Sequence, residues 1–505
     1  MEPELDLTEA QHRAVTTDAR RVVVLAAAGS GKTRVLTERI RRRVELEEVS
    51  ADHVLATTFS RRAADELRRR LWRVGIKEVR AKTFHATALE IVGEHRRRLN
   101  RPEPQLLVDR RGLLAELSRS KQVSGLDQEI TWAKANLVTP DAYLSRSRGR
   151  RPPGGVERFA SLYEAYELRR RRSGQLDFDD LITEATSALE QDEAFANGVR
   201  FTRRHLFVDE FQDVNASQLR LFDALAANDP DFFIVGDPNQ SIYGFNGADQ
   251  GLLTAMPKRY RNVEVIELTR NHRSTTSIVS AATAVLGMPF NGETGGELPR
   301  VAAFDSDVDE AAAVAASIAD AGAPFAERAV LARTNAQLPA FAEALHALGV
   351  PTVNAGADHG PRGAFNQAEA RPGLDGRDGD GDAVVLSTFH RAKGLEWDSV
   401  YVVGAAEGTT PMRQATQNPK ALAEEQRAFY VALSRARRRL AVTWARRAGD
   451  GNTGEPARQP SRWLEVIVAR IAELEAVHAP LPPDEAVARA QEIRDSMQWE
   501  VRTDA

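Results

Sequence analysis

A glycine-containing loop near the start of the chain has the residue types needed to hold a phosphate group. Its sequence is AAAGSGKT at residues 26–33, and it lies between the apolar run VVVL at 22–25 and a segment with helical patterning. Glycines let backbone N–H groups surround a phosphate, a lysine reaches the outer phosphates of a nucleotide, and a hydroxyl at the helix N-terminus binds Mg²⁺. We therefore predict a nucleotide site formed by Ala28, Gly29, Ser30, Gly31, Lys32, Thr33 and Arg34.

Two carboxylates follow a second apolar run, and a glutamine follows a third. Asp209 and Glu210 come directly after LFV at 206–208, and Gln240 comes after FIV at 233–235. Ligand sites of parallel α/β sheets lie at the carboxyl ends of the strands, so we expect these groups beside the phosphate loop. There Asp209 can hold Mg²⁺, Glu210 can orient or deprotonate an attacking water, and Gln240 can contact the γ-phosphate. An Asp-Glu pair alone is more often a helix cap.

Two arginines have the chemistry to stabilise the charge that develops on a transferred phosphoryl group. Arg273 lies in the segment NHRST at 271–275, and Arg435 lies in YVALSRA at 430–436. Guanidinium groups suit this task because they stay charged and present several donors in a fixed plane. Taken alone, each arginine is more often part of a surface ion pair. Only its position after the other motifs favours the catalytic interpretation.

The order of these segments resembles that of the motifs in UvrD/Rep/PcrA helicases of superfamily one. The matching positions are Lys32, DEFQD at 209–213, QSIY at 240–243, NHRST at 271–275, TFHRAKGLEW at 388–397 and YVALSRA at 430–436. The resemblance extends over about residues 5–445, and in detail it looks most like divergent UvrD-like helicases of actinobacteria. It implies a DNA-dependent ATPase and helicase that hydrolyses ATP with Mg²⁺ and moves 3′ to 5′ on single-stranded DNA.

The resemblance also implies roles for individual residues. The implied catalytic residues are Lys32, Asp209, Glu210, Gln240, Arg273 and Arg435, the last two as arginine fingers. Gln11 would bind adenine, and Glu396 would contact the nucleotide near the ribose. Thr33 and Asp209 would hold the metal ion. In such helicases ATP is hydrolysed in the cleft between two RecA-like lobes, so the reaction depends on groups from both lobes.

A further set of residues matches the strand-binding segments of these helicases. The set is Thr58, Phe59, Arg61, Thr83, His85, Tyr243, Phe245, Thr388 and His390. Phe59, Tyr243 and Phe245 are candidates for base stacking, which contributes about 1–3 kcal/mol per base whatever the sequence. Any of these rings could instead belong to a hydrophobic core. The expected partners are single-stranded DNA, DNA junctions, and proteins of DNA repair or replication.

Short apolar runs separated by helical stretches predict the elements that position these residues. The runs lie at 22–25, 207–208, 233–235, 263–266, 329–331, 384–386, 400–403 and 440–442. Such runs are typical of parallel strands buried on both faces. We expect an α/β fold with two RecA-like P-loop lobes. The first lobe is 1–270, with a helical insertion at about 90–175, and the second is 271–445, followed by a linker and helical extension at 446–505.

The main departure from the family pattern is the short distance between Arg273 and Lys393. Relatives insert a second helical subdomain here, whereas this chain has a stretch rich in Gly, Pro and Asp at about 354–382, which predicts a disordered linker. The sequence therefore leaves open an alternative, an ATP-gated module that binds single-stranded DNA and hydrolyses ATP without unwinding duplex. A third hypothesis is a P-loop ATPase acting on protein or RNA.

Composition sets outer limits on these hypotheses. A chain of 505 residues is too long for one hydrophobic core, so at least two domains are expected. The absence of cysteine excludes disulfides and cysteine-based metal sites. The net charge of −4 predicts no overall affinity for nucleic acid, although 68 Lys and Arg residues could gather on one face. We expect a cytoplasmic protein that does not enter the membrane, because no signal-peptide pattern and no long apolar run occur.

Overall fold

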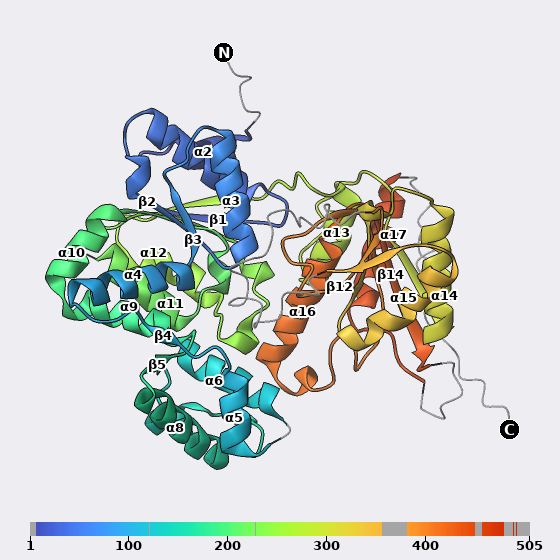
Figure 1. The fold of residues 1–505 in the computed structure, drawn as a ribbon. Coiled ribbons are helices and arrows are strands. Elements are labelled where there is room, and N and C mark those ends of the chain that lie inside the picture. The colour runs from blue at the N-terminus through green and yellow to red at the C-terminus, as the bar shows by residue number, and fades with distance from the viewer. Residues whose placement is uncertain are drawn as a thin grey trace. The chain divides into compact units, whose positions relative to one another are not determined.

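Two compact units, each built on a parallel β-sheet, make up the described part of the chain (Figure 1). The computed structural model describes residues 7–120, 122–227, 229–355, 381–449 and 457–478, together with residues 488 and 491. The first unit is Met1–Arg270 and the second is Asn271–Ala505. The predicted α/β fold class, with two RecA-like lobes, is confirmed.

The sheet of the first unit consists of six parallel strands. Their order is β3 (Arg80–Thr83), β2 (Val54–Thr58), β6 (His205–Val208), β7 (Asp231–Gly236), β1 (Arg21–Ala26) and β8 (Glu264–Leu268). Side chains of β1 alternate between two buried faces, since Val23 belongs to one core cluster whereas Val22 and Val24 belong to another. β-Branched residues suit such a strand because both of its faces are packed. The predicted runs at 22–25, 207–208, 233–235 and 263–266 all lie in or overlap these strands.

Helices connect the strands of this sheet. Outside the insertion they are α1 (Glu9–Thr16), α2 (Lys32–Glu45), α3 (Arg61–Arg73), α4 (Phe84–Arg98), α9 (Asp180–Gln191), α10 (Glu193–Thr202), α11 (Ala216–Ala226) and α12 (Gly251–Arg259). Short 3₁₀ helices are η1 (Ala51–His53), η2 (Phe211–Asp213), η3 (Pro238–Gln240) and η4 (Gly244–Asn246). The last three follow the carboxyl ends of β6 and β7, where the polar motif residues lie.

A helical insertion separates α4 from α9 (Figure 1). It contains β4 (Gln105–Leu106), α5 (Arg110–Ser118), α6 (Val123–Ala135), α7 (Pro140–Arg146), α8 (Val156–Arg172) and β5 (Gln175–Leu176). The short strands β4 and β5 pair in parallel where the chain enters and leaves the insertion. A core of its own, which includes Leu114, Ile130, Tyr143, Phe159 and Tyr166, lets these helices fold as one body.

Helix α4 belongs to the lobe itself. The predicted insertion begins at about residue 90, which is inside α4, but Ile91 and Val92 pack with Leu181 of α9 in the core beneath the sheet. Helical periodicity does not distinguish a helix that covers a sheet from one that leaves it. The separate core of the insertion therefore begins only after β4.

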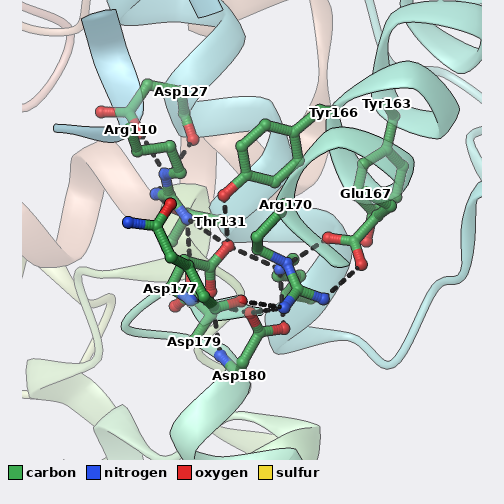
Figure 2. A network of polar contacts seen from close by, with 12 residues as sticks. Arg110, Asp127, Thr131, Tyr163, Tyr166, Glu167, Arg170, Asp177, Asp179 and Asp180 are labelled. Atoms are coloured by element: carbon green, nitrogen blue, oxygen red, sulfur yellow. Dashed lines mark hydrogen bonds and ion pairs between the residues drawn. The ribbon is translucent and has the colours of Figure 1, made fainter. Parts of the chain in front are cut away.

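A buried network of charged side chains joins the insertion to the start of α9 (Figure 2). Arg110 of α5 pairs with Asp127 and Asp179, each at 2.6 Å, and Arg170 of α8 lies 2.9 Å from Asp180. The hydroxyl of Tyr166 donates to Asp177 at 2.6 Å. These groups come from the insertion and from the turn between β5 and α9. The network therefore fixes how the insertion meets the rest of its lobe.

Lys134 of α6 is the cation at the centre of this network. Its Nζ lies 2.7 Å from Glu167, 2.5 Å from Asp177 and 2.8 Å from Asp180. These three carboxylates have the spacing of a metal site, but the ammonium group of the chain itself contacts all of them. Although burial alone would raise it, Lys134 and Arg110 hold the pKa of Asp177 well below its ordinary value. The carboxylates are thus neutralised internally.

The second unit repeats the plan of a six-stranded parallel sheet. The strand order is β11 (Thr352–Asn354), β12 (Val384–Thr388), β10 (Arg328–Ala332), β13 (Trp397–Val402), β14 (Ala436–Arg447) and β9 (Arg300–Ser306). Its helices are α13 (Thr276–Val285), α14 (Asp307–Asp320), α15 (Leu338–Ala347), α16 (Pro419–Leu433) and α17 (Leu464–His478), with 3₁₀ helices η5 (Phe325–Glu327), η6 (Asn335–Gln337) and η7 (Ala415–Gln417). The predicted runs between 329 and 442 form β10, β12, β13 and β14, whereas β9 and β11 were not predicted.

Two predictions concern segments at the edges of the second unit. Most of the predicted disordered linker at about 354–382, namely residues 356–380, lies outside the described residues. Within the predicted extension at 446–505, α17 packs on α13, where Arg470 donates to the carbonyl oxygens of Ser280 at 3.0 Å and Met288 at 2.8 Å. Among the described residues, every helix is too short or too polar to cross a lipid bilayer.

We expect Lys134→Met to lower the free energy of unfolding by about 3–5 kcal/mol, because it leaves buried carboxylates without their central cation. Urea unfolding followed by circular dichroism measures this change. Arg97→Met is the matched control, since Arg97 pairs with Glu103 at the surface, where both side chains are 62% exposed, and its loss should change stability little. Wild-type stability of Lys134→Met would show that the network does not hold the insertion.

Candidate functional site

The phosphate loop connects the end of β1 to the start of α2. Gly29 and Gly31 have φ angles of +70° and +85°, a region that favours glycine. A Cβ at Gly31 would also lie only 2.8 Å from Nε2 of Gln11, so the close approach requires glycine too. Because α2 begins at Lys32, its first backbone N–H groups and the positive end of its dipole are available to a phosphate.

A hydroxyl and a carboxylate meet beside this loop. Thr33 Oγ1 donates to Asp209 Oδ2 at 2.8 Å, and the backbone N–H of Glu210 donates to Asp209 Oδ1 at 2.9 Å. Burial, together with the neighbouring charge of Glu210, raises the pKa of Asp209 to about 6. A buried carboxylate beside a hydroxyl offers the oxygen ligands that Mg²⁺ prefers, and it would gain stability from a cation. The two residues therefore fit the predicted metal ion.

Lys32 and Gln240 meet at a third residue, Asp237. Lys32 Nζ lies 3.9 Å from Asp237 Oδ2, and Gln240 Nε2 donates to the same oxygen at 2.6 Å. Gln212 Oε1 accepts from the backbone N–H of Asp237 at 2.9 Å, and its Nε2 donates to Glu210. No role was predicted for Asp237 or Gln212, although Gln212 lies within DEFQD at 209–213 and Asp237 lies between FIV at 233–235 and Gln240. The structure thus brings the predicted catalytic residues of the first unit to one sheet edge.

Gln11 lies against the backbone of the phosphate loop. Its Nε2 donates to the carbonyl oxygen of Ser30 at 2.9 Å, and its Oε1 accepts from the backbone N–H of Thr8 at 3.0 Å in the N-terminal cap of α1. Ala28 is buried in the loop, and Arg34 is partly exposed on α2. The contact of Gln11 with adenine remains a prediction, because both the nitrogen and the oxygen of its amide already form hydrogen bonds within the chain.

Arg39 of α2 holds α1 in this position. Its guanidinium donates to the carbonyl oxygens of Ala14 at 3.1 Å, Thr17 at 2.9 Å and Ala19 at 2.8 Å, at and beyond the C-terminal end of α1. Burial, with a smaller contribution from Arg43, lowers the pKa of Arg39 to about 10. The group stays charged at neutral pH, so it can satisfy helix carbonyls that have no other partner within the helix.

Three aromatic rings predicted to stack on bases come together in the first unit. The rings of Phe59 and Tyr243 are stacked, with centroids 4.9 Å apart and an interplanar angle of 17°, and Phe245 meets Tyr243 edge-on at 6.1 Å. Phe59 is 38% and Phe245 is 37% exposed, so this is not a closed core. Thr58 is buried at the end of β2, and Arg61 is exposed at the start of α3. We call Phe59, Tyr243 and Phe245 the aromatic cluster.

Thr83 and His85 lie at the start of α4. Thr83 Oγ1 accepts from the backbone N–H of Ala86 at 3.2 Å and caps the helix, whereas the ring of His85 stacks on Phe178 at 4.0 Å and 13°. Burial lowers the pKa of His85 to about 4, against the opposing effect of Asp179 and Asp177. At neutral pH, without bound DNA, the imidazole is therefore uncharged.

In the second unit, Arg273 contacts Glu396. Arg273 Nε donates to Glu396 Oε2 at 2.6 Å, although 123 positions of sequence separate the two residues. Ser274 Oγ donates to the carbonyl oxygen of Ala436 at 2.6 Å, which holds the segment at 271–275 beside the start of β14. Among the described residues, the buried Nη1 of Arg273 has no hydrogen-bond partner. This nitrogen retains donors for a further acceptor.

Arg435 is buried within the same unit. It is 1% exposed, and its guanidinium donates to the carbonyl oxygens of Val431 at 2.9 Å and Leu395 at 3.2 Å. The backbone N–H of Trp397 donates to the carbonyl oxygen of Arg435 at 3.1 Å. The segments at 271–275, 394–397 and 434–437 therefore meet, but the structure shows Arg435 bonded to its own unit, and its role as a finger remains a prediction.

The two remaining predicted residues follow the carboxyl end of β12. Thr388 is 7% exposed, and its Oγ1 accepts from the backbone N–H of Arg391 at 3.4 Å. His390 is partly exposed in the turn after the strand. Their place at a sheet edge resembles that of Thr58 and Phe59 at the end of β2. No contact in the structure tests whether they bind DNA.

A parallel sheet whose carboxyl edge carries a phosphate loop, a hydroxyl–carboxylate pair and a glutamine defines a P-loop nucleotide-hydrolysing protein. Two family descriptions match the chain, the UvrD/REP helicase N-terminal domain at residues 7–261 and the UvrD-like helicase C-terminal domain at residues 370–447.

Several curated proteins are similar to the chain. ATP-dependent DNA helicase UvrD2 of Mycobacterium tuberculosis is 32% identical, over 91% of this chain and 81% of that protein. A probable DNA helicase of Mycoplasma pneumoniae is 27% identical, over 91% of this chain and 87% of its own length. DNA helicase II of Escherichia coli is 32% identical, over 68% of this chain and 51% of its own length. The chain belongs to the UvrD/REP helicase family, whose members are ATP-dependent DNA helicases.

The low pKa of His85 predicts a pH dependence of stability. Unfolding returns this pKa from about 4 toward 6.5, so below pH 6.5 the unfolded chain takes up a proton that the native state excludes, and stability falls as the pH falls toward 4. His85→Phe keeps a ring to stack on Phe178 and removes the titration. Urea unfolding at pH 7.5 and 5.0 should therefore show a smaller loss of stability in His85→Phe than in the wild type.

The control for this measurement is His12→Gln, which removes an imidazole at an exposed position of α1. Its loss of stability between the two pH values should match that of the wild type more closely than that of His85→Phe. An identical pH dependence in the wild type and in His85→Phe would contradict the burial of a neutral imidazole.

Proposed function

We propose that the chain is an ATP-driven motor that moves 3′ to 5′ along single-stranded DNA and separates duplex strands, in DNA repair or replication. The observation that carries the proposal is the convergence at one sheet edge of Lys32 and Thr33 with Asp209 and Glu210. Family membership supplies the reaction class. Strand displacement on a duplex with a 3′ single-stranded tail separates this proposal from an ATP-gated module that does not unwind.

In the proposed reaction, groups of this chain mainly position the nucleotide and the attacking water and neutralise phosphate charge. Backbone N–H groups of the phosphate loop and the ammonium of Lys32 bind the outer phosphates, and Gln240 contacts the γ-phosphate. Glu210 orients the attacking water and accepts its proton. Thr33 and Asp209 would hold Mg²⁺, which when bound neutralises phosphate charge. Asp237 keeps Lys32 and Gln240 together, since it contacts both.

Residues of the second unit complete the proposed reaction. Arg273 and Arg435 stabilise charge on the transferred phosphoryl group, and Glu396, which already holds Arg273, contacts the nucleotide near the ribose. Of the two arginines, Arg273 needs less rearrangement to bind a phosphoryl oxygen, because its Nη1 is not bonded to another described group. Arg435 acts only after its bonds to Val431 and Leu395 are exchanged for phosphate oxygens.

The proposed DNA contacts combine phosphate binding with base stacking. Phe59, Tyr243 and Phe245 offer ring faces that accept any base, and Arg61 offers a charge to the backbone. Neutral His85 and the capping residue Thr83 would contact the strand by hydrogen bonds alone, and Thr388 and His390 would do so in the second unit. Single-stranded DNA and DNA junctions are the proposed partners, with repair or replication proteins beyond them.

Hydrolysis should depend differently on Lys32 and Glu210. Lys32→Ala should lose both nucleotide binding and turnover, whereas Glu210→Gln should lose about 100-fold or more in kcat but keep its affinity for ATP, because the phosphate cradle is intact. Phosphate release with saturating single-stranded DNA and binding of a fluorescent ATP analogue measure the two effects. Glu184→Gln, at an exposed position on α9, is the control. Near-wild-type turnover in Glu210→Gln would show that the carboxylate is wrongly assigned.

DNA affinity should depend on salt and on the aromatic cluster, but not on base sequence. Phe59→Ala should weaken binding of single-stranded DNA about 10-fold, because one stacked base contributes about 1–3 kcal/mol, and log K should fall linearly with log salt. Fluorescence anisotropy with labelled oligonucleotides of different sequence measures both. Trp72→Ala removes an aromatic ring, 52% exposed, outside the cluster and should leave binding unchanged. A strong base preference, or no salt dependence, would count against a motor.

A further inference from the structure

The segment that follows β7 is fastened to the segment that follows β6 at several points. Ser241 Oγ donates to the carbonyl oxygen of Gln212 at 3.0 Å, and the backbone N–H of Asp249 donates to the carbonyl oxygen of Val214 at 3.2 Å. Between these two points lies the part of the chain that carries Tyr243 and Phe245 of the aromatic cluster. The carboxylate motif at 209–213 and the proposed base-stacking rings are therefore mechanically connected.

Gln212 is the residue at which this connection reaches the proposed catalytic groups. Its side-chain Nε2 donates to the carboxylate of Glu210, and its Oε1 accepts from the backbone N–H of Asp237 at 2.9 Å. Asp237 in turn accepts from Gln240 at 2.6 Å and lies 3.9 Å from Lys32. The amide of Gln212 thus connects Glu210, which is proposed to orient water, with the segment of Gln240, which is proposed to contact the γ-phosphate.

The surroundings leave the amide of Gln212 little freedom. The residue is 0% exposed, and a Cβ at Gly236 would lie 2.7 Å from its Oε1 and 2.7 Å from a methyl carbon of Leu253. The site needs a donor toward Glu210 and an acceptor toward Asp237, which an amide side chain supplies and a carboxylate or thioether does not. The site therefore requires both the amide group and the length of the Gln212 side chain.

A second observation places Tyr243 in the same electrostatic environment. Burial, followed by the charges of Asp213 and Glu210, raises the pKa of Tyr243 above its ordinary value. The ring that stacks on Phe59 is thus close enough to the carboxylate motif to respond to its charge. Residues 210–213 and 237–243 thus connect the aromatic cluster, the proposed DNA surface, to Glu210, the proposed water-orienting group.

We propose that Gln212 is a positioning residue that fixes the carboxylate of Glu210 to the segment at 237–241 and thereby couples occupancy of the aromatic cluster to hydrolysis. The inference rests on the proposed function and deepens it. Gln212 touches neither phosphate nor DNA in this account, and it acts through Glu210 on one side and through Asp237 on the other. Stacking of a base on Tyr243 or Phe245 shifts the segment, and the amide transmits the shift to the carboxylate.

The test compares Gln212→Met with the wild type and with Gln218→Met, each in the 505-residue chain. Methionine keeps the length of the side chain and removes both hydrogen bonds. Gln218 is the matched control because it is a buried glutamine that forms the capping box of α11, where it exchanges hydrogen bonds with Asn215. The measurements are kcat with and without single-stranded DNA, the Kd of a non-hydrolysable ATP analogue, and the Kd of the DNA.

Gln212→Met should lower the DNA-stimulated kcat about 10- to 100-fold and reduce the ratio of stimulated to basal rate, since a misplaced group loses rate rather than binding. Both dissociation constants should stay within about twofold of the wild type, and Gln218→Met should keep wild-type turnover. Stimulation within about twofold of the wild type, or a parallel loss of ATP affinity and kcat, would overturn the inference.

Gln212→Glu keeps the size of the side chain and the acceptor for Asp237, but it places a second carboxylate beside Glu210. It should show the same loss of stimulated kcat, so the inference remains testable if Gln212→Met does not fold. A Gln212→Glu variant with wild-type stimulation would also overturn it. A wild-type chain whose hydrolysis does not respond to DNA would instead refute the proposed function, whatever the variants do.

Discussion

Parallel pairing of β6, β7 and β1 is the constraint on which the nucleotide site depends. Val208 pairs with Ile234, and Leu25 pairs with Gly236, so the three strands reach the same edge of the sheet together. The segments that leave this edge carry Lys32, Asp209 and Asp237. A shift of one residue in any strand would turn its buried side chains to the opposite face. The alternating packing of Val22, Val23 and Val24 therefore also fixes where the polar groups stand.

Much of this scaffold could be predicted because most of its central strands are continuous apolar runs, although β2, which is buried between β3 and β6, was not among the predicted runs. β1, β7, β10 and β12 are buried along nearly their whole length, and the sequence shows each of them directly. β3, with the sequence RAKT, has a neighbour on one side only, and its composition does not distinguish it from a loop. Edge strands need less apolar surface, so their sequences carry a weaker pattern.

The motifs predicted which residues belong to the site, but not how those residues contact one another. Motif order led to Lys32, Asp209, Glu210, Gln240, Arg273 and Glu396, and the structure places these residues in two groups, one in each unit. The hydrogen-bond partners were not accessible, because they depend on the exact approach of separate segments. Gln212 and Asp237 became visible only through such bonds, and the burial of Arg435 against Val431 could not be read from YVALSRA.

The charged network at the base of the insertion adds a constraint of a different kind. Burying so many ions costs several kcal/mol each before their attraction offsets it, so a buried charge that loses its partner is strongly destabilising. Only an arrangement that brings Arg110, Lys134 and Arg170 to their carboxylates avoids unpaired buried charge. Phe178 lies between Asp177 and Asp179 in this turn and stacks on His85. The position of the insertion and the position of a proposed strand-binding residue are therefore set by the same few residues.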